Sequence, residues 1–198
     1  LMLRVAAFVS GGGTNLQAII DAQTAGTIRD AKVELVISNV STAYALERAK
    51  NHNVAGVTLR RKDFESKADW ETALIKEIED CGAQLIVLAG FMAILSEDFT
   101  KHFENKIINV HPSLIPSFCG EGMYGLHVHE AALAKGVKVS GATVHFVNEE
   151  VDGGKIIAQK AVEVQPDDTP ETLQKRIMQQ AEWIILPQAI DDIANNRI

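Results

Sequence analysis

Strand, glycine turn and helix follow one another in Val5-Ala-Ala-Phe-Val-Ser-Gly-Gly-Gly-Thr-Asn-Leu-Gln-Ala-Ile-Ile20. The first five residues form a short apolar run that is typical of a buried strand. After the glycines, Leu16, Ile19 and Ile20 have the i, i+3, i+4 spacing of a helix. Such a turn presents free backbone N–H groups at the start of a helix, where the helix dipole also favours an anion.

The glycine turn is therefore a candidate phosphate site. Its glycines let a ligand come close to the backbone, and Thr14 and Asn15 add side-chain donors. The lysine of the P-loop pattern GxxxxGK[ST] is absent, and the turn does not match GxGxxG. Glycine-rich sequences also form ordinary tight turns, so this stretch alone leaves the two interpretations equally open.

Strand and helix signals alternate along most of the chain. Apolar runs predict further strands at residues 33–38, 57–59, 85–89, 107–110, 143–147 and 156–164. Helical spacing predicts helices at residues 43–50, 69–79 and 127–135, and one long helix that begins at Pro170. This order predicts an α/β fold, a doubly wound and mostly parallel sheet, with a hairpin that adds antiparallel strands toward one edge. We expect a single domain over residues 1–198, since no repeat or low-complexity segment divides the sequence.

Composition and charge narrow the classes of function. Apolar residues make up 46% of the chain and charged residues 23%, which is ordinary for a soluble globular protein. The 19 basic and 26 acidic residues give a net charge of −7, which disfavours broad nucleic-acid binding. Cys81 and Cys119 lack metal-binding spacing, and no apolar run reaches membrane-spanning length. We therefore expect a cytoplasmic domain without nucleic-acid, membrane or metal partners, and the short opening segment does not resemble a signal peptide.

A polar pair stands at the end of one expected strand. Asn109 and His111 are two residues apart, so on a strand their side chains point to the same face. An amide beside an imidazole can polarise a carbonyl and move a proton. The alternative is a strand end whose polar residues cap a turn, and the stretch alone balances the two. Ligands of doubly wound folds bind at the carboxyl ends of the strands, where this pair meets the glycine turn and the apolar loop Gly90–Leu95, and this favours a functional site.

Several longer motifs occur in order and span essentially the whole chain. They are Ser10-Gly-Gly-Gly-Thr-Asn-Leu-Gln-Ala18, Leu88-Ala-Gly-Phe-Met92, Ile108-Asn-Val-His-Pro-Ser-Leu-Ile-Pro116, Gly141-Ala-Thr-Val-His-Phe-Val147, Val151-Asp-Gly-Gly154 and Arg176 to Glu182. Together they resemble the phosphoribosylglycinamide formyltransferase family. The resemblance implies that 10-formyltetrahydrofolate, as a cosubstrate, gives its formyl group to the amine of glycinamide ribonucleotide in purine biosynthesis. It implies no metal, and a monomer or a homodimer.

The same resemblance assigns three catalytic residues, Asn109, His111 and Asp152. Asn109 and a protonated His111 would donate hydrogen bonds to the oxyanion that forms on the formyl group. Asp152 would act as a carboxylate that favours the imidazolium form of His111. The alternative for Asp152 is a simple Asp-Gly turn, in which aspartate is common.

The resemblance also assigns binding residues. The substrate phosphate is expected on Gly13, Thr14 and Asn15, and the ribose on Glu182. The folate is expected to contact Lys67, Met92, Ala93, Ile94, Leu95, Asn109, Asn148, Glu149, Glu150, Val151 and Asp152. The Ile115–Pro116 bond is expected to be cis.

This chain departs from the family's usual pattern at a few positions. Ala93 stands where many relatives have arginine, and Trp183 where histidine is usual. The loop Phe118–Gly125 is longer than usual, should border the active site, and carries Cys119 where proline is common. We expect Cys119 to be a free thiol without a role. His127 and His129 have no third ligand nearby and are interpreted as ordinary residues at a helix start.

Three other functions deserve comparison. Formyltetrahydrofolate hydrolase is expected to carry an additional N-terminal regulatory domain, and methionyl-tRNA formyltransferase a C-terminal RNA-binding domain; we recognise neither in this sequence. The third is a catalytically inactive module that binds a nucleotide or a folate. The presence of Asn109, His111 and Asp152 argues against that reading.

Overall fold

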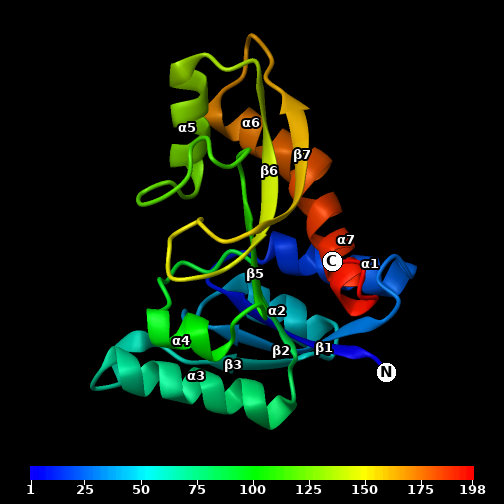
Figure 1. Cartoon of the computed structure of the whole chain (residues 1–198), viewed down its shortest axis with the longest axis vertical. Helices are drawn as coiled ribbons and strands as arrows, with labels where there is room; N and C mark the ends of the chain where they lie inside the picture. The colour runs from blue at the N-terminus through cyan, green and yellow to red at the C-terminus, as the bar shows by residue number, and fades with distance from the viewer.

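The computed structural model describes residues 1–198 and contains one seven-stranded sheet with helices on both faces (Figure 1). The strands are β1 (Leu3–Val9), β2 (Ala31–Ser38), β3 (Ala55–Thr58), β4 (Leu85–Leu88), β5 (Ile107–His111), β6 (Val139–Phe146) and β7 (Ile156–Glu163). The α-helices are α1 (Thr14–Ala25), α2 (Tyr44–Asn51), α3 (Lys67–Cys81), α4 (Glu97–His102), α5 (Leu126–Lys135), α6 (Pro170–Ile177) and α7 (Trp183–Ala194). A 3₁₀ turn spans Arg61–Asp63 and a π-helix spans Met178–Glu182.

The sheet has the strand order β3-β2-β1-β4-β5-β6-β7. The pairs from β3 to β5 are parallel, whereas β6 runs antiparallel to both β5 and β7. This confirms the expected doubly wound sheet with antiparallel strands at one edge. The chain moves outward from β1 to β3 and then returns to place β4 on the other side of β1. The neighbouring ends of β1 and β4 therefore form the switch point of the sheet, where such folds bind ligands.

Side chains that alternate along β1 divide the core into two layers. Val5, Ala7 and Val9 pack on the face covered by α1, α2, α5, α6 and α7. Ala6 and Phe8 pack on the opposite face against α3 and α4. Figure 1 shows α3 and α4 on one side of the sheet, and α1 with α7 on the other. The buried alternation explains why this strand reads as a continuous apolar run.

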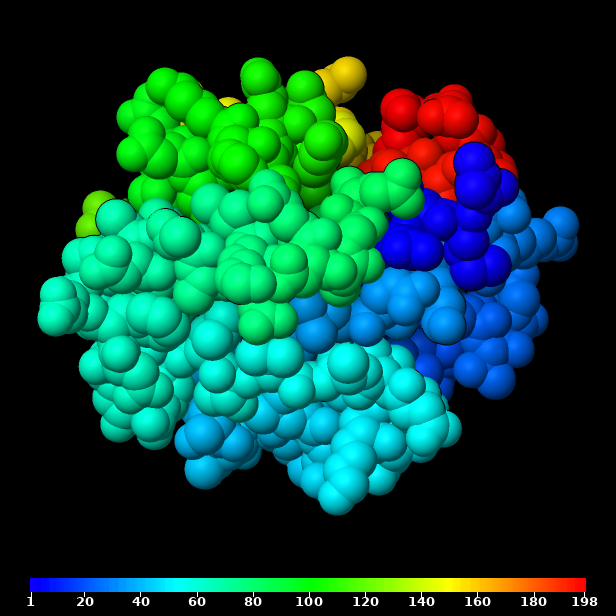
Figure 2. Space-filling view, turned by 90° about the horizontal axis from the view of Figure 1, so that it is seen from below, coloured from blue at the N-terminus to red at the C-terminus, as the bar shows by residue number.

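The C-terminal helix differs from the sequence prediction. A single long helix was expected from Pro170, but the π-helix separates α6 from α7. A π-helical turn holds one more residue than an α-helical turn, and hydrophobic spacing does not reveal it. The turn ends at Glu182, which belongs to the expected ribose site. In Figure 2, seen from below, the end of this helical region (red) lies beside the N-terminal residues (dark blue).

Smaller differences concern short elements. Helix α4 was not predicted, because six residues are too few for a periodic pattern. The basic residues Arg61 and Lys62 lie in the 3₁₀ turn. Strand β6 begins four residues before the expected position, at Val139. The Ile115–Pro116 bond is cis, as expected. No helix combines the length and the apolar character needed to cross a membrane.

Candidate active site

Loops that follow three strands meet at the switch point. The N–H of Ser10 donates to the carbonyl of Gly90, with a distance of 3.1 Å between nitrogen and oxygen. The N–H of Met92 donates to Oγ of Ser10 at 2.7 Å. Leu88 at the end of β4 pairs with Asn109 on β5. The predicted convergence of the glycine turn, the apolar loop and the polar pair is confirmed by these contacts.

Helix α2 holds the glycine turn from behind. The N–H of Ala45 donates to the carbonyl of Gly11 at 3.0 Å, and Nε of Arg48 donates to the carbonyl of Gly12 at 2.7 Å. Gly13 has a φ of 76°, and a Cβ at this position would lie 2.6 Å from Cβ of Ala45. Only glycine therefore fits this position, both in backbone conformation and in space.

The other side of the turn is open. No side chain caps α1, so the N–H groups of its first turn remain free. A Cβ at Gly11 or Gly12 would meet no atom within 4 Å. The first turn contains no acidic residue, and the twelve-residue helix directs its dipole at this opening. The turn thus has the geometry of an anion site.

His111 is buried between two acceptors. Its Nε2 lies 2.8 Å from the carbonyl oxygen of Phe118, and its Nδ1 lies 3.6 Å from Oδ2 of Asp152. A carbonyl can only accept, so Nε2 carries a proton. Asp152 thus lies beside Nδ1, while Phe118 contacts the other nitrogen of the ring.

His145 orients the amide of Asn109. The two residues are direct partners in the pairing of β5 with β6, and Nδ2 of Asn109 lies 3.3 Å from Nε2 of His145. Nδ1 of His145 lies 2.8 Å from the carbonyl oxygen of Phe146, so Nδ1 carries the proton and Nε2 accepts. Burial lowers the pKa of His145, which keeps the ring neutral although Asp152 acts in the opposite direction. The second N–H of the Asn109 amide is left for another acceptor.

The turn after β6 brings Asp152 into this cluster. Asp152 has a φ of 56°, and its Oδ2 accepts the N–H of Gly120 at 3.0 Å. Its Oδ1 lies 3.8 Å from Nε2 of His145. Gly154 closes the turn so tightly that a Cβ there would lie 1.6 Å from the carbonyl oxygen of Phe146. The Asp-Gly turn and the contact with His111 are thus one structure rather than alternatives.

The loop Phe118–Gly125 borders the cluster, as expected, through Phe118 and Gly120. Cys119 is a free thiol whose Sγ lies 3.4 Å from the carbonyl oxygen of Pro116. Burial and the negative charges of Asp152 and Glu150 raise its pKa. The thiol form is therefore favoured over the reactive thiolate.

The apolar loop after β4 places its expected folate residues differently. Met92 and Ile94 are 58% and 65% exposed, which is unusual for large apolar side chains. Leu95 is buried in the core layer against α3, and Ala93 packs partly on the same layer. Leu95 is therefore mainly a core residue, which the sequence alone did not indicate.

The other expected folate residues lie on a turn and on a helix start. Asn148, Glu149, Glu150 and Val151 are exposed, and Oδ1 of Asn148 accepts the N–H of Glu150 at 3.0 Å. Figure 1 shows this segment (yellow) leaving the β6–β7 hairpin toward the region of α4. Lys67 is the first residue of α3 and forms no ion pair. No side-chain hydrogen bond or ion pair joins Lys67 to the rest of the site.

Glu182 and Asn15 form a buried polar pair near the glycine turn. Glu182 is 5% exposed, and burial raises its pKa to about 7, although a hydrogen bond to the Asn15 side chain opposes that shift. Oδ1 of Asn15 and Oε2 of Glu182 have no hydrogen-bond partner, and neither has Nε1 of Trp183. Buried polar atoms without a partner are costly, so a donor that reached the two oxygens would be stabilised.

Sequence reasoning missed several residues around the site. His145 lies in a recognised motif, but only the register of β5 and β6 pairs it with Asn109.

His127 is exposed and pairs with Glu130, as an ordinary helix-start residue would. His129 is instead fully buried, both of its ring nitrogens lack partners, and burial, with the nearby His111, lowers its pKa to about 4. No group of three or more His, Cys, Asp or Glu side chains is arranged to hold a metal ion.

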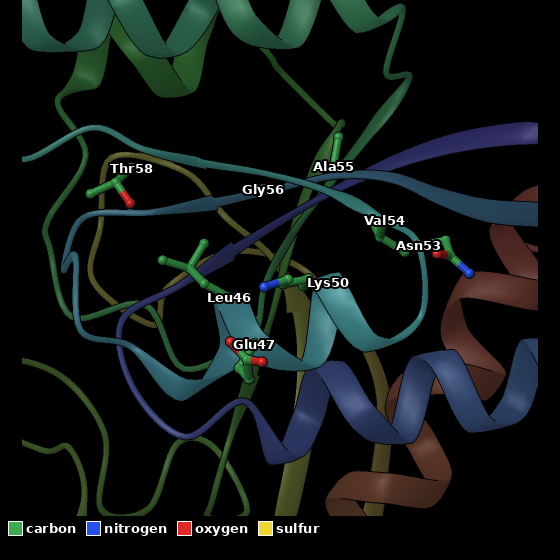
Figure 3. Close-up of a pocket in the computed structure, with 8 residues that line it drawn as sticks. All are labelled: Leu46, Glu47, Lys50, Asn53, Val54, Ala55, Gly56 and Thr58. Carbon is green, nitrogen blue, oxygen red and sulfur yellow. The ribbon is translucent and has the colours of Figure 1, made fainter.

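A groove of about 720 Å³ lies elsewhere on the molecule (Figure 3). Its walls come from α2 and the edge strand β3, and include Leu46, Lys50 and Gly56. None of the expected catalytic or folate residues lines it. The groove is therefore separate from the polar cluster at the carboxyl edge.

Known proteins resemble this chain over its whole length. A family model described as formyl transferase matches residues 3–190. The chain belongs to this family. It is 41% identical to a phosphoribosylglycinamide formyltransferase of Haemophilus influenzae over 197 residues, which cover all of this chain and 90% of that protein.

Other relatives have the same fold or are much longer. A crystal structure of glycinamide ribonucleotide transformylase 1 from Symbiobacterium toebii superposes with a TM-score of 0.92 at 41% identity, and covers 99% of this chain and 89% of the other. A trifunctional purine biosynthetic protein of Gallus gallus is 40% identical over 99% of this chain, which spans only 19% of that protein. This formyl transferase thus has the family's fold, and its relatives work in purine biosynthesis.

Proposed function

We propose that this formyl transferase moves the formyl group of 10-formyltetrahydrofolate to the amine of N1-(5-phosphoribosyl)glycinamide. The products are the N-formyl ribonucleotide and tetrahydrofolate. The observation that carries the proposal is the position of the cluster of Asn109, His111 and Asp152. It lies between a free helix start suited to a phosphate and a loop with exposed apolar side chains. The full-length similarity to enzymes named for this reaction supports the same substrates.

Asn109 and His111 would stabilise the charge that develops during transfer. The folate supplies an activated formyl group, whose oxygen becomes an oxyanion when the substrate amine attacks the carbon. Asn109 offers the amide N–H that His145 leaves free, and His111 offers the N–H of its Nε2. The carbonyl of Phe118 occupies that second donor, so it must give way to the oxyanion. Charge-assisted donors in a site shielded from water stabilise such a transition state strongly.

Asp152 would offset the positive charge of His111 and take part in the proton transfers. A bond forms between the amine nitrogen and the formyl carbon, and the bond from that carbon to the folate nitrogen breaks. One proton leaves the attacking nitrogen, and one reaches the folate nitrogen. Asp152 lies near both His111 and His145, so it can hold the imidazolium and accept a proton within the cluster.

The binding residues follow from the same arrangement. The phosphate would bind at Gly13, Thr14 and Asn15, whose open side and free N–H groups suit an anion. A ribose hydroxyl would donate to the partnerless oxygens of Asn15 and Glu182. Glu182 is the least accessible member of this set.

The folate would lie between the loop after β4 and the turn before Asp152. The exposed side chains of Met92, Ile94 and Val151 suit an apolar ring system. The further expected contacts are Ala93, Leu95, Asn109, Asn148, Glu149 and Glu150. Leu95 is buried, and Ala93 stands where many relatives have arginine. Both would therefore contribute backbone groups. Lys67 would meet the negatively charged tail, and this contact rests on the family resemblance alone.

The wider setting of the enzyme is proposed from the sequence alone. We infer one catalytic domain over residues 1–198 that acts on small molecules, without a metal or a nucleic acid. A cytoplasmic location and a monomeric or homodimeric state stay predictions. The trifunctional relatives show that the same domain also occurs within longer chains.

A spectrophotometric assay with both substrates tests the proposal against its rivals. We expect the absorbance change of folate release only when glycinamide ribonucleotide is present, with N-formyl product in equal amount. Folate release without the ribonucleotide would indicate a hydrolase. Binding of both ligands without any transfer would indicate an inactive binding module.

A further inference from the structure

The hydroxyl of Ser10 joins three loops at the switch point. It donates to Oδ1 of Asn39, after β2, at 2.5 Å, and it accepts the N–H of Met92, after β4, at 2.7 Å. Its own backbone N–H donates to the carbonyl of Gly90 at 3.1 Å. A hydroxyl can donate only one hydrogen bond, and Oδ1 of Asn39 accepts it. The orientation of the group is thus fixed, and a lone pair is directed at Met92.

Ser10 also begins the glycine turn, because Gly11, Gly12 and Gly13 follow it directly. The residue therefore belongs to the expected phosphate loop by its backbone and to the expected folate loop by its side chain. A shift of the turn when it binds an anion would move the acceptor of the Met92 N–H.

The folate loop has a second, independent anchor at its other end. Both oxygens of Glu71, a buried residue of α3, accept from Ser96, one from its N–H at 2.8 Å and one from its hydroxyl. Between the two anchors, Met92 and Ile94 expose most of their side chains and gain little from packing. Ser10 and Glu71 thus supply the polar contacts at the two ends of the loop, while Leu95 and Ala93 pack on the core layer between them.

We propose that Ser10 is a positioning residue that couples the two substrate sites, so that an occupied glycine turn raises the affinity of the loop after β4 for the folate. The coupling rests on the proposed function, since it assigns the two ligands to these loops. Its physical basis is a shared contact: an anion that shifts the glycine turn also shifts the Ser10 hydroxyl, and with it the acceptor of the Met92 N–H in the folate loop. Glu71 fixes the same loop without touching the glycine turn, and so it should affect affinity without affecting coupling.

Isothermal titration with tetrahydrofolate, in the absence and presence of saturating glycinamide ribonucleotide, measures the coupling without turnover, because neither ligand carries a formyl group. We expect the wild-type Kd for tetrahydrofolate to fall about five-fold when the ribonucleotide is present, a modest coupling of the kind one hydrogen bond can carry. In Ser10→Ala that ratio should approach one. Asn39→Ala keeps Ser10 but removes the acceptor of its hydroxyl. It should reduce the ratio at least by half.

Glu71→Gln is the matched control. It should raise the Kd for tetrahydrofolate with and without the ribonucleotide, and leave their ratio as in the wild type. A wild-type ratio of one, an undiminished ratio in Ser10→Ala or Asn39→Ala, or an equal loss of the ratio in Glu71→Gln would overturn the coupling. Coupled binding without formyl transfer would overturn the proposed function alone, and transfer without coupling would overturn this inference alone.

Discussion

Nε2 of His111 lies 2.8 Å from the carbonyl oxygen of Phe118, so the loop after β5 holds the histidine at the centre of the site. The same loop holds the carboxylate opposite, because the N–H of Gly120 donates to Asp152. Two backbone groups, two residues apart, thus contact both members of the His111–Asp152 pair. The loop is part of the proposed catalytic arrangement and not only its border.

The contact from Gly120 can be tested by two substitutions that strain the loop alike. Gly120 and Gly122 both have positive φ, at 95° and 81°, and neither has an atom within 4 Å of an added Cβ. Alanine at either position should therefore cost about 1 kcal/mol of stability. Only Gly120 contacts Asp152, so Gly120→Ala should lower kcat about ten-fold and Gly122→Ala less than about three-fold. Steady-state kinetics and thermal unfolding measure both effects, and equal losses of kcat would contradict the role of the contact.

His145 should be needed for turnover although it is not one of the three expected catalytic residues. His145→Phe keeps an aromatic ring but removes the acceptor for the Asn109 amide. We expect kcat to fall about ten-fold or more, with smaller changes in KM, because the amide is no longer held toward the oxyanion. His127→Phe is the control, since His127 is exposed and contacts only Tyr124 and Glu130. Turnover of His145→Phe within two-fold of the control would refute this.

Alanine at Gly13 should affect stability, whereas alanine at the neighbouring Gly12 should affect substrate binding. Gly13→Ala should lower the free energy of unfolding by about 2 to 3 kcal/mol, because of its positive φ and its clash with Ala45. Gly12→Ala meets no atom and should leave that free energy within about 0.5 kcal/mol. Its methyl group would enter the space proposed for the phosphate, so the KM for the ribonucleotide should rise. Chemical denaturation and steady-state kinetics separate the effects; an unchanged KM in Gly12→Ala would place the phosphate elsewhere.

Replacing Glu182 should stabilise the folded protein, and the gain should grow as the pH rises. Burial raises its pKa from 4.5 to about 7, so the folded state holds the proton more tightly than the unfolded chain does. The wild type therefore loses stability as the pH rises from about 4.5 through 7, where the unfolded carboxyl ionises first. Glu182→Gln should match the wild type below pH 4.5 and exceed it by about 3 kcal/mol above pH 8.

Denaturation at several pH values measures this difference. Glu104→Gln, at an exposed carboxylate without an ion pair, should show little change at any of these pH values. An unchanged difference between Glu182→Gln and the wild type from pH 4 to pH 8 would show that Glu182 ionises as freely as an exposed carboxyl.

The features that could be predicted from the sequence are those that depend on local patterns of residues. Apolar runs and helical spacing located every strand and most helices, and the glycine turn and the Asn109–His111 pair followed from single stretches. Contacts that depend on strand register or on packing between layers could not be predicted from the sequence. The pairing of His145 with Asn109 depends on register, and the burial of Leu95 and His129 depends on the layers around them. The π-helix before Trp183 leaves hydrophobic spacing nearly unchanged, so a continuous helix was predicted there.

Pre-steady-state formyl transfer by Asp152→Asn and His111→Ala tests the central claim most directly, namely that the buried His111–Asp152 pair performs the chemistry. Asparagine keeps the size of Asp152 and its acceptor for Gly120, but removes the charge that faces His111. With both substrates saturating, the account predicts that each variant stays folded, binds both ligands, and loses at least about 100-fold in the rate of transfer. Transfer at the wild-type rate in either variant would contradict it.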